Sequence, residues 1–580
     1  MENGEKQIKD LFAGVKIFCI PPYQRSYAWE EEKQLKDFLD DLKNQKVDKN
    51  YFFGTLLFQE DGEEDGFYKI SIVDGQQRLT TIVIFMKVLI DYLKEKRENV
   101  KILEDIYLKY ENKIKLRLQD DDNEFFQTYI LGNDKTAIIN TPSQGRLLEA
   151  KRFFYKELLV LSLDQLKELR EKVEHSKLLT YSVSNSAEAA LIFETTNDRG
   201  KILTNLEKTK SFLMYKSYIS NKEKDCEDLL NNISKRFSEI YRKLEEIKKK
   251  DPTIDEDSIL QYHFIAYEHW NKKRDYQNYL QGIKSKINEL ILEKEDIKAA
   301  LYIDEYSQRL RETFDTFYNL SEIKAEYVRN LFLLERMGIF YPLLIKTYNL
   351  DETKDKTEFL HITKLLEIFS FRILSLKIKR SNDIDTFLNS LANKFEGDFS
   401  SLITSLKDKI LELAPNSLFK AKLSSTNFYK EFSSNDQNYL YWKYENYLRT
   451  SGGAKYAKMS EQEFSVRGKK FGLSVEHIAS QNPKVTTSEI KFEEFTEDFK
   501  ENFLNCIGNL TFDPQSANSS KGNKSVPEKN NKYFVRAPFM TQNELCEFIK
   551  EGKWTRESIK DREKKLIDFA SNSWDPEKVD

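Results

Sequence analysis

Apolar and polar positions along this 580-residue chain predict short strands near both ends and helices between them. Residues 68–73 read Y-K-I-S-I-V, a β-rich run, and the Asp74-Gly75 turn signal follows directly. Beyond the turn, apolar residues recur at helical spacing, at Leu79, Ile82, Val83 and Met86. This stretch therefore predicts a strand, a tight turn and an amphipathic helix that begins at Gln76.

The middle of the chain is charged and strongly helical in pattern. Residues 325–348 and 358–379 carry long apolar periodicity, which predicts packed bundle helices. The sequence K-K-K-D-P at 248–252 predicts a helix end and a linker. We therefore expect a mainly α fold with α+β ends. Its predicted domains are residues 1–215, a helical middle at 216–425, and 426–580.

Composition narrows the classes of protein that fit. No apolar run reaches eighteen residues and the first ten residues are polar and charged, so we expect a cytoplasmic protein without a membrane partner. The 92 basic and 96 acidic residues give a net charge of −4, so contact with nucleic acid must be local. The basic run at 521–536 is one such place. Four cysteines stand singly, which excludes a zinc knuckle and indicates a reducing compartment.

Candidate chemistry is densest near the C-terminus. Glu476 and His477 end a short β-like run, and Asn518 follows a second such run about forty residues later. That order suits a one-metal nuclease, in which His477 deprotonates water while Glu476 and Asn518 hold a divalent cation on the scissile phosphate. A carboxylate and an amide oxygen favour Mg²⁺ or Mn²⁺ over zinc. In a strand the two neighbours point to opposite sides, but a bent ββα hairpin can bring both to one edge.

Further residues belong to the same candidate site. Lys521 and Lys524 follow Asn518 by three and six residues, so a helical turn would put them near its face, where they could contact phosphate. Asn509, in the sequence I-G-N-L, is counted with the catalytic set. The alternative is that His477 is a partly buried strand histidine and that the asparagines form turns.

A second candidate site lies at the start of the helix predicted from Gln76. Gly75 permits close backbone approach, and the helix start offers free N–H groups and positive dipole to an anion. Arg78 lies in that first turn, where it could bind phosphate, and neither Gln76 nor Gln77 has an evident packing role. The alternative is a purely structural strand–turn–helix connection.

A third motif occupies residues 193–207, with the sequence F-E-T-T-N-D-R-G-K-I-L-T-N-L-E. Asn197 and Arg199 lie in its polar loop and are candidate ligand-binding residues. Thr204 and Glu207 have the spacing of a capping box, which predicts that a helix begins beside them.

These segments resemble the GmrSD-like type IV restriction enzymes and related anti-phage proteins of bacteria. The N-terminal matches to that family's motifs are Pro22, Gln24, Arg25 and Tyr27, then Asp74, Gly75, Gln76, Gln77 and Arg78, then Phe193, Asn197, Arg199 and Gly200. The C-terminal matches are the E-H-I and G-N-L sequences, which resemble HNH (His-Me finger) nucleases, and Arg562, Leu566 and Trp574.

The resemblance implies a ParB/sulfiredoxin-like domain in residues 1–215 that binds a nucleoside triphosphate, through the N-terminal motifs, and senses DNA. It implies a ββα-metal (HNH) nuclease embedded in helices in residues 426–580. The resemblance implies an NTP-regulated, metal-dependent endonuclease or nickase with NTPase activity, which restricts modified double-stranded phage DNA. A homodimer is left open.

One departure from the family keeps two alternatives in view. The family usually has E-H-I-x-P-Q, whereas this chain has Ala479-Ser480-Gln481 after E-H-I. A nucleotide-dependent DNA-binding switch with reduced nuclease activity is therefore one alternative. The other is a nuclease toxin of abortive infection that does not discriminate between modified and plain DNA.

Overall fold

The computed structural model forms two compact units. One is built from Met1–Phe264 with Asn271–Tyr318, and the other from Ile265–Trp270 with Asn319–Asp580. We call them unit 1 and unit 2, and the three-domain division stays a prediction. The structure describes residues 4–44, 52–132, 136–183, 204–220, 223–268, 279–293, 295–451, 457–460, 473–481, 496–551 and 553–579.

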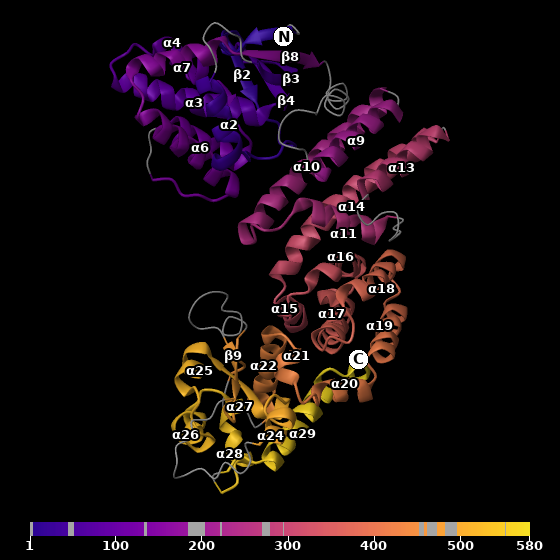
Figure 1. The fold of residues 1–580 in the computed structure, drawn as a ribbon. Coiled ribbons are helices and arrows are strands. Elements are labelled where there is room, and N and C mark those ends of the chain that lie inside the picture. The colour runs from indigo at the N-terminus through magenta and orange to yellow at the C-terminus, as the bar shows by residue number, and fades with distance from the viewer. Residues whose placement is uncertain are drawn as a thin grey trace. The chain divides into compact units, whose positions relative to one another are not determined.

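A six-stranded mixed sheet organises unit 1 (Figure 1). Its strands, in spatial order, are β1 (Gly4–Gln7), β8 (Lys177–Val183), β3 (Phe52–Glu64), β4 (Phe67–Asp74), β2 (Lys16–Cys19) and β7 (Leu116–Arg117). β3 pairs antiparallel with β4 and parallel with β8, while β2 pairs parallel with β4 and β7. The predicted strand at 68–73 is confirmed as β4.

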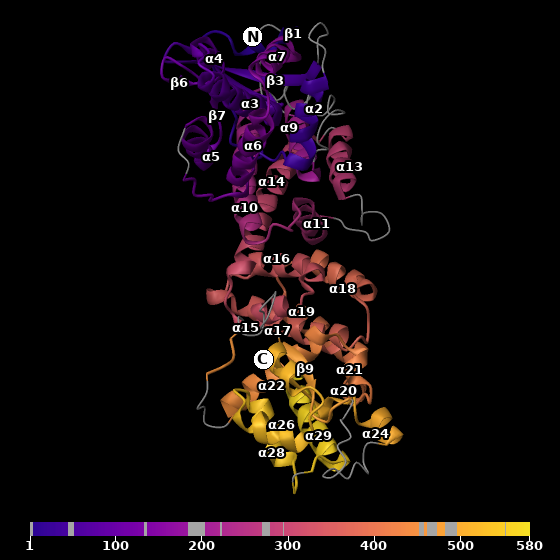
Figure 2. The same ribbon diagram turned by 60° about the vertical axis from the view of Figure 1, so that its left-hand side comes forward.

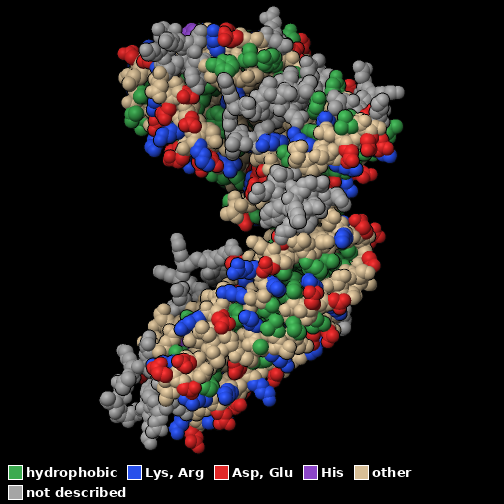
Figure 3. Space-filling model, turned by 45° about the vertical axis from the view of Figure 1, so that its right-hand side comes forward, with side chains coloured by type: hydrophobic (Ala, Val, Ile, Leu, Met, Phe, Trp, Pro, Cys, Tyr) green, Lys and Arg blue, Asp and Glu red, His purple; other side chains and the backbone are tan. Residues whose placement is uncertain are grey.

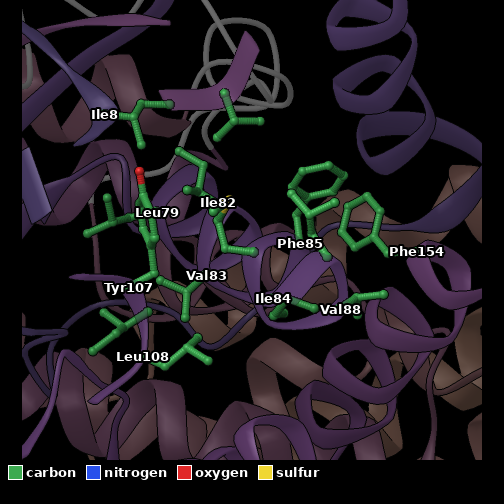
Figure 4. Packing of buried hydrophobic residues seen from close by; sticks show 14 of the residues in the cluster. Ile8, Leu79, Ile82, Val83, Ile84, Phe85, Val88, Tyr107, Leu108 and Phe154 are labelled. Atoms are coloured by element: carbon green, nitrogen blue, oxygen red, sulfur yellow. The ribbon is translucent and has the colours of Figure 1, made fainter. Parts of the chain in front are cut away.

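The helix that follows β4 is the centre of the unit 1 core. It is α3 (Gln76–Glu95), and its first residue is the predicted one. Figure 4 shows its apolar side chains packed against Tyr107, Leu108 and Phe154. The predicted amphipathic pattern is wrong, because α3 is buried on nearly all sides from Gln76 to Leu93. A helix enclosed by a sheet and other helices has no solvent face to keep polar.

The other helices of unit 1 surround this core or extend from it. Within the described residues they are α1 (Ile8–Phe12), α2 (Lys36–Asn44), α4 (Lys101–Tyr107), α5 (Asp120–Phe125), α6 (Pro142–Leu159), α7 (Leu163–His175), α9 (Asn205–Ser220), α10 (Glu223–Lys250), α13 (Tyr279–Leu292) and most of α11 (Glu256–Tyr267) and α14 (Asp296–Glu322). The predicted helix end at 248–252 is confirmed by the end of α10. β5 (Lys109–Tyr110) and β6 (Lys113–Ile114) form a separate, short antiparallel pair.

Unit 2 begins as a stack of helices. These are α15 (Glu326–Leu333), α16 (Tyr341–Leu350), α17 (Thr357–Phe369), α18 (Ser381–Lys394), α19 (Phe399–Leu413), α20 (Asn416–Leu423), α21 (Phe428–Glu431) and α22 (Ser434–Ser451). α16 packs beside α18, and α17 beside α15 and α19 (Figure 2). The bundle helices predicted at 325–348 and 358–379 are present, but each span is broken, by a turn before α16 and by a π-helical segment (Ser370–Ser375) after α17.

The rest of unit 2 holds an antiparallel strand pair and short helices. β9 (Leu473–His477) pairs with β10 (Leu510–Pro514), and α25 (Gln515–Lys521) follows β10 and packs against both strands. The remaining helices are α24 (Glu497–Asn502), α26 (Val526–Lys532), α27 (Met540–Asn543), α28 (Leu545–Phe548) and α29 (Arg556–Ser573). Both predicted β-like runs are thus strands, and a helix contains Asn518 as expected.

The expected mainly α fold is confirmed, and the structure adds a mixed sheet near the N-terminus. Acidic and basic side chains are interspersed over the face drawn in Figure 3, in keeping with the small net charge. Among the described helices, none is long and apolar enough to cross a membrane.

Candidate functional sites

Strand pairing fixes the faces on which the predicted catalytic residues lie. In the antiparallel register, Glu476 lies opposite Thr511, and His477 lies opposite Leu510. Because successive residues of a strand point to opposite faces, Glu476 shares its face with Thr511, whereas His477 is on the other face. Ser474 and its partner Asp513 belong to the Glu476 face.

Asn518 is brought to the Glu476 face of the strand pair by α25. Its Nδ2 donates hydrogen bonds to Ser474 Oγ (2.8 Å) and to the Val475 carbonyl (3.3 Å). In this orientation Oδ1, the atom that can ligate a cation, is left without a hydrogen-bond partner among the described residues. Of the two predicted metal ligands, Glu476 is therefore on β9 and Asn518 lies beside that strand.

Glu476 already has a cationic neighbour. Lys529, on α26, donates to Glu476 Oε1 at 2.5 Å and to the His477 carbonyl at 2.7 Å. The two side chains are 1% and 5% exposed, so the pair is out of contact with bulk water. Burial raises the pKa of Glu476, while the charges of Lys529 and Lys521 act against that shift.

A second buried ion pair lies beside the first. Lys521 Nζ is 2.7 Å from Asp513 Oδ2 and 3.1 Å from Gln542 Oε1, and its side chain is 2% exposed. The predicted contact between Lys521 and phosphate would therefore require this pair to open. Lys524 lies beyond the end of α25, where its ammonium group donates to the Ser520 and Lys521 carbonyls.

His477 is enclosed on its own face of the strand pair. Its Nε2 lies 3.2 Å from Asn505 Oδ1 and 3.2 Å from Gln481 Nε2, and the Tyr429 ring packs against the imidazole at 4.4 Å. Burial lowers the pKa of His477 to about 4; the bond to Asn505 acts against this, and Lys529 and Lys430 add to it. The imidazole is therefore neutral at pH 7, as a general base must be.

Asn509 acts as a structural anchor in this arrangement. Its Oδ1 accepts hydrogen bonds from the Ala479 N–H and from Trp554 Nε1, both at 2.9 Å, and its Nδ2 donates to the Leu504 carbonyl at 2.9 Å. The side chain is fully buried. These bonds hold the backbone just after His477, so the Asn509 side chain positions the end of the strand.

The loop that departs from the family pattern is also held in place. Ser480 Oγ donates to the Lys524 carbonyl at 2.7 Å, which joins the segment after His477 to the segment after α25. A side-chain hydrogen bond therefore supports this loop at the position where the family usually has a proline.

Sequence reasoning missed several partners of the candidate catalytic residues. Lys529 was counted only within the basic run at 521–536, and Asp513, Asn505 and Gln481 were not singled out. One signal was present, because Val526 and Lys529 are three residues apart and share a face of α26, where both are buried. A lysine on the apolar face of a helix indicates a buried partner.

In unit 1, glutamine side chains join the segment that contains Gln24 and Arg25 to α3. Gln24 Nε2 donates to the Val73 carbonyl at 2.6 Å, and Gln76 Nε2 donates to the Arg25 carbonyl at 2.9 Å. Gln77 donates to the Ser26 carbonyl at 3.1 Å and accepts from the Ala28 N–H at 2.8 Å. The absence of a packing role for Gln76 and Gln77 was therefore a wrong expectation, since buried amides need partners.

The Gly75 turn and Arg78 also have structural partners. Gly75 has a φ of 89°, in the left-handed region that favours glycine. Nη1 of Arg78 donates to the Thr55 carbonyl at 2.6 Å, so the guanidinium group is held against β3. Asp74, just before the turn, is buried, which raises its pKa, while Arg78 acts against that shift.

The first residues of α9 contact the same segment. Arg25 Nε lies 3.0 Å from Glu207 Oε1, and the buried Lys210 donates to the Tyr23 carbonyl at 2.8 Å. The capping box is confirmed, because Thr204 N–H donates to Glu207 Oε2 and Glu207 N–H to Thr204 Oγ1. Asn197 and Arg199 lie outside the described residues.

Tyr27 joins the same network through a 2.8 Å hydrogen bond between its hydroxyl and Thr81 Oγ1. Between the Tyr27 segment and α3 is a cavity of about 10 Å³, which is room for about one water molecule. Its polar lining comes from Arg25, Ser26, Tyr27, Gln76, Gln77, Thr80, Gln119 and Asp122. A triphosphate held by these residues would require the segment and α3 to separate, or would bind at their outer edge.

The donor atoms near β9 fit a hard divalent cation. Glu476 Oε2 has no hydrogen-bond partner in the described parts of the chain, and the orientation of Asn518 leaves an amide oxygen beside the same strand. Carboxylate and amide oxygens are the ligands that Mg²⁺ and Mn²⁺ prefer. Within the described residues, no group of three or more His, Cys, Asp or Glu side chains is placed to hold a metal, so such a cation would keep several waters.

Comparison with known proteins gives two matches, one at each end of the chain. The N-terminal domain of GmrSD restriction endonuclease matches residues 8–214, and the C-terminal domain of GmrSD restriction endonucleases matches residues 414–569. A search of curated proteins gives no match. The two matched domains cover more than half of the sequence and occur in the expected order. The chain belongs to the GmrSD family of type IV restriction endonucleases.

Proposed function

We propose that this restriction endonuclease cuts or nicks DNA at the end of β9, in an HNH-type site that depends on a divalent cation. The observation that carries the proposal is the arrangement of the strand pair and α25. It puts the amide of Asn518 beside the strand that carries Glu476, and a buried, neutral His477 ends that strand with its side chain on the other face. These are the residue types that metal-assisted phosphodiester hydrolysis requires.

Each residue has a defined task in this proposal. Glu476 and Asn518 Oδ1 would hold Mg²⁺ or Mn²⁺, which stabilises the negative charge that develops on the phosphate. His477 takes a proton from the attacking water, and it can do so because it is uncharged at pH 7. Asn505 and Gln481 orient the imidazole, and Asn509 fixes the backbone that follows it.

Regulation by a nucleoside triphosphate and restriction of modified phage DNA belong to the same proposal. The segment with Gln24 and Arg25, the start of α3 and the start of α9 are joined by partly buried hydrogen bonds and an ion pair. A ligand that moves one of these three elements would therefore move the others. This linkage supports a ParB/sulfiredoxin-like sensing role for unit 1, in which Arg25 and Arg78 offer charge to phosphate.

One observation favours the alternative of a DNA-binding switch with reduced nuclease activity. Glu476 is neutralised by Lys529, so its carboxylate has a cationic partner without any metal. The measurement that decides between the two functions is nicking of supercoiled plasmid.

We expect His477→Ala to reduce nicking in Mg²⁺ by about 10²–10⁴-fold, the usual effect of losing a general base. His361→Ala is the matched control, because the His361 side chain is 43% exposed and lies 4.0 Å from Glu358, away from the strand pair in sequence. EDTA should stop the wild type. Equal nicking by His477→Ala and wild type, with both variants folded, would overturn the nuclease assignment.

A further inference from the structure

Two buried ion pairs lie together on the Glu476 face of the strand pair. Glu476 pairs with Lys529, and Asp513 pairs with Lys521; all four side chains are at most 5% exposed. Glu476 and Asp513 are two residues apart in register, since Asp513 is opposite Ser474. Two carboxylates and two ammonium groups make this cluster electrically neutral.

A divalent cation on Glu476 would change that balance. It would add two positive charges to a neutral cluster from which bulk water is excluded, where charges are weakly screened and repel strongly. The free energy of the loaded cluster falls if one ammonium group leaves as the metal arrives. The carboxylate then exchanges one cation for another and is never left unpaired.

Lys529 is the lysine whose departure the contacts favour. It is bonded to Glu476 itself, the proposed ligand, and its other bond is to a backbone carbonyl. Lys521 is bonded instead to Asp513 and Gln542, and its ammonium group also lies 4.9 Å from the centre of the Phe534 ring. Lys529 comes from α26, whereas Lys521 is in α25, the helix that also carries the other proposed ligand, Asn518.

We propose that Lys529 is a built-in competitor of the metal, which holds Glu476 until a divalent cation displaces it. The inference rests on the proposed metal site and adds a means of control to it. At low metal concentration the Lys529 ammonium group stays paired with the Glu476 carboxylate, and the nuclease is inactive. When the cation binds, Lys529 leaves the buried cluster and its ammonium group becomes accessible.

The first test measures the accessibility of Lys529 in the full-length wild-type protein. The protein is treated with a small amine-acylating reagent, with and without MnCl₂, and modification of each lysine is quantified by mass spectrometry of peptides. We expect Mn²⁺ to increase modification of Lys529 and to leave Lys521 protected. Unchanged protection of Lys529 at saturating Mn²⁺ would overturn the proposal.

The second test measures Mn²⁺ affinity by calorimetry without DNA, so it is independent of cleavage. Lys529→Met removes the competitor and should bind Mn²⁺ about tenfold more tightly or better, a change equivalent to about 1.4 kcal/mol. Lys532→Met is the matched control, because it removes the same charge from an exposed position of α26 and should bind like the wild type.

Glu476→Gln separates failure of the competitor from failure of the site. If this variant loses Mn²⁺ binding while Lys529→Met gains none, the metal site stands and the competition is wrong. If Glu476→Gln binds Mn²⁺ like the wild type, the proposed metal site is wrong, and the proposed competition by Lys529 is wrong as well. The acylation test needs no variant, so it decides even if Lys529→Met does not fold.

Discussion

At the residue scale, the two asparagines of the C-terminal motif have different roles. Asn518 donates from Nδ2 to β9, and its Oδ1 is the atom proposed to bind the cation. In Asn509, by contrast, both Oδ1 and Nδ2 form hydrogen bonds within the protein. Both were predicted as catalytic from the same pattern. The distinction follows from burial, because an amide enclosed by backbone donors and acceptors holds the fold.

We expect Asn509→Ala to destabilise unit 2 as well as to reduce cleavage. The change leaves the Ala479 N–H and Trp554 Nε1–H without their acceptor, and each unsatisfied buried donor costs about 1–3 kcal/mol. The urea midpoint of unfolding should fall. Asn502→Ala, at an exposed asparagine bonded to Asp498, should leave the midpoint nearly unchanged. A fully stable Asn509→Ala with lost activity would show a catalytic role.

Lys210 gives unit 1 a predictable pH dependence. Burial lowers its pKa from 10.5 to about 7, so between pH 7 and 10.5 the unfolded chain binds more protons at this residue than the folded protein does. The contribution of Lys210 to the free energy of unfolding therefore rises with pH across that window. Urea midpoints of unfolding are measured for the wild type and for Lys210→Met at pH 7 and at pH 9.5. We expect the midpoint of the wild type to rise relative to that of the variant as the pH rises. A constant difference would contradict the shifted pKa.

At the element scale, the turn between β4 and α3 depends on its glycine for two reasons. The φ of Gly75 is in the left-handed region, and a Cβ at this position would come within 2.1 Å of Leu56 Cδ2. The turn thus sets how closely α3 approaches β3. That approach in turn places Gln76, Gln77 and Arg78 against their carbonyl partners.

We expect Gly75→Ala to lower stability by more than backbone strain alone, which is typically of order 1–3 kcal/mol. Gly14→Ala is the matched control, because Gly14 has a φ of 84° and no atom within 4 Å of an added Cβ. Thermal unfolding of the two variants separates strain from the steric conflict with Leu56. Equal loss of stability in both would show that Leu56 moves away at no cost.

At the scale of the whole molecule, regulation by nucleotide implies reciprocal binding. If a triphosphate changes the affinity for cognate DNA by some factor, the DNA must change the affinity for the triphosphate by the same factor. Labelled nucleotide titrated with and without modified DNA measures that factor. Equal nucleotide affinities, together with cleavage rates that ignore nucleotide, would show two sites that act independently.

The sequence by itself determined the family, the mainly helical fold with a sheet near the N-terminus, and the elements that carry the motifs. β4, α3, β9 and α25 occur where local patterns predict them, because turn signals and apolar spacing act over a few residues. The capping box at Thr204 and Glu207 was predictable for the same reason.

Only the tertiary structure decided which polar residues pair with one another. Lys529 and Glu476 are 53 residues apart, and Arg25 and Glu207 are further apart still, so no local pattern could connect them. The same applies to α3, whose burial on nearly all sides depends on the elements that surround it. A buried charge or amide takes whatever partner the fold brings within reach, and that partner is set by packing between distant segments, not by neighbours in the sequence.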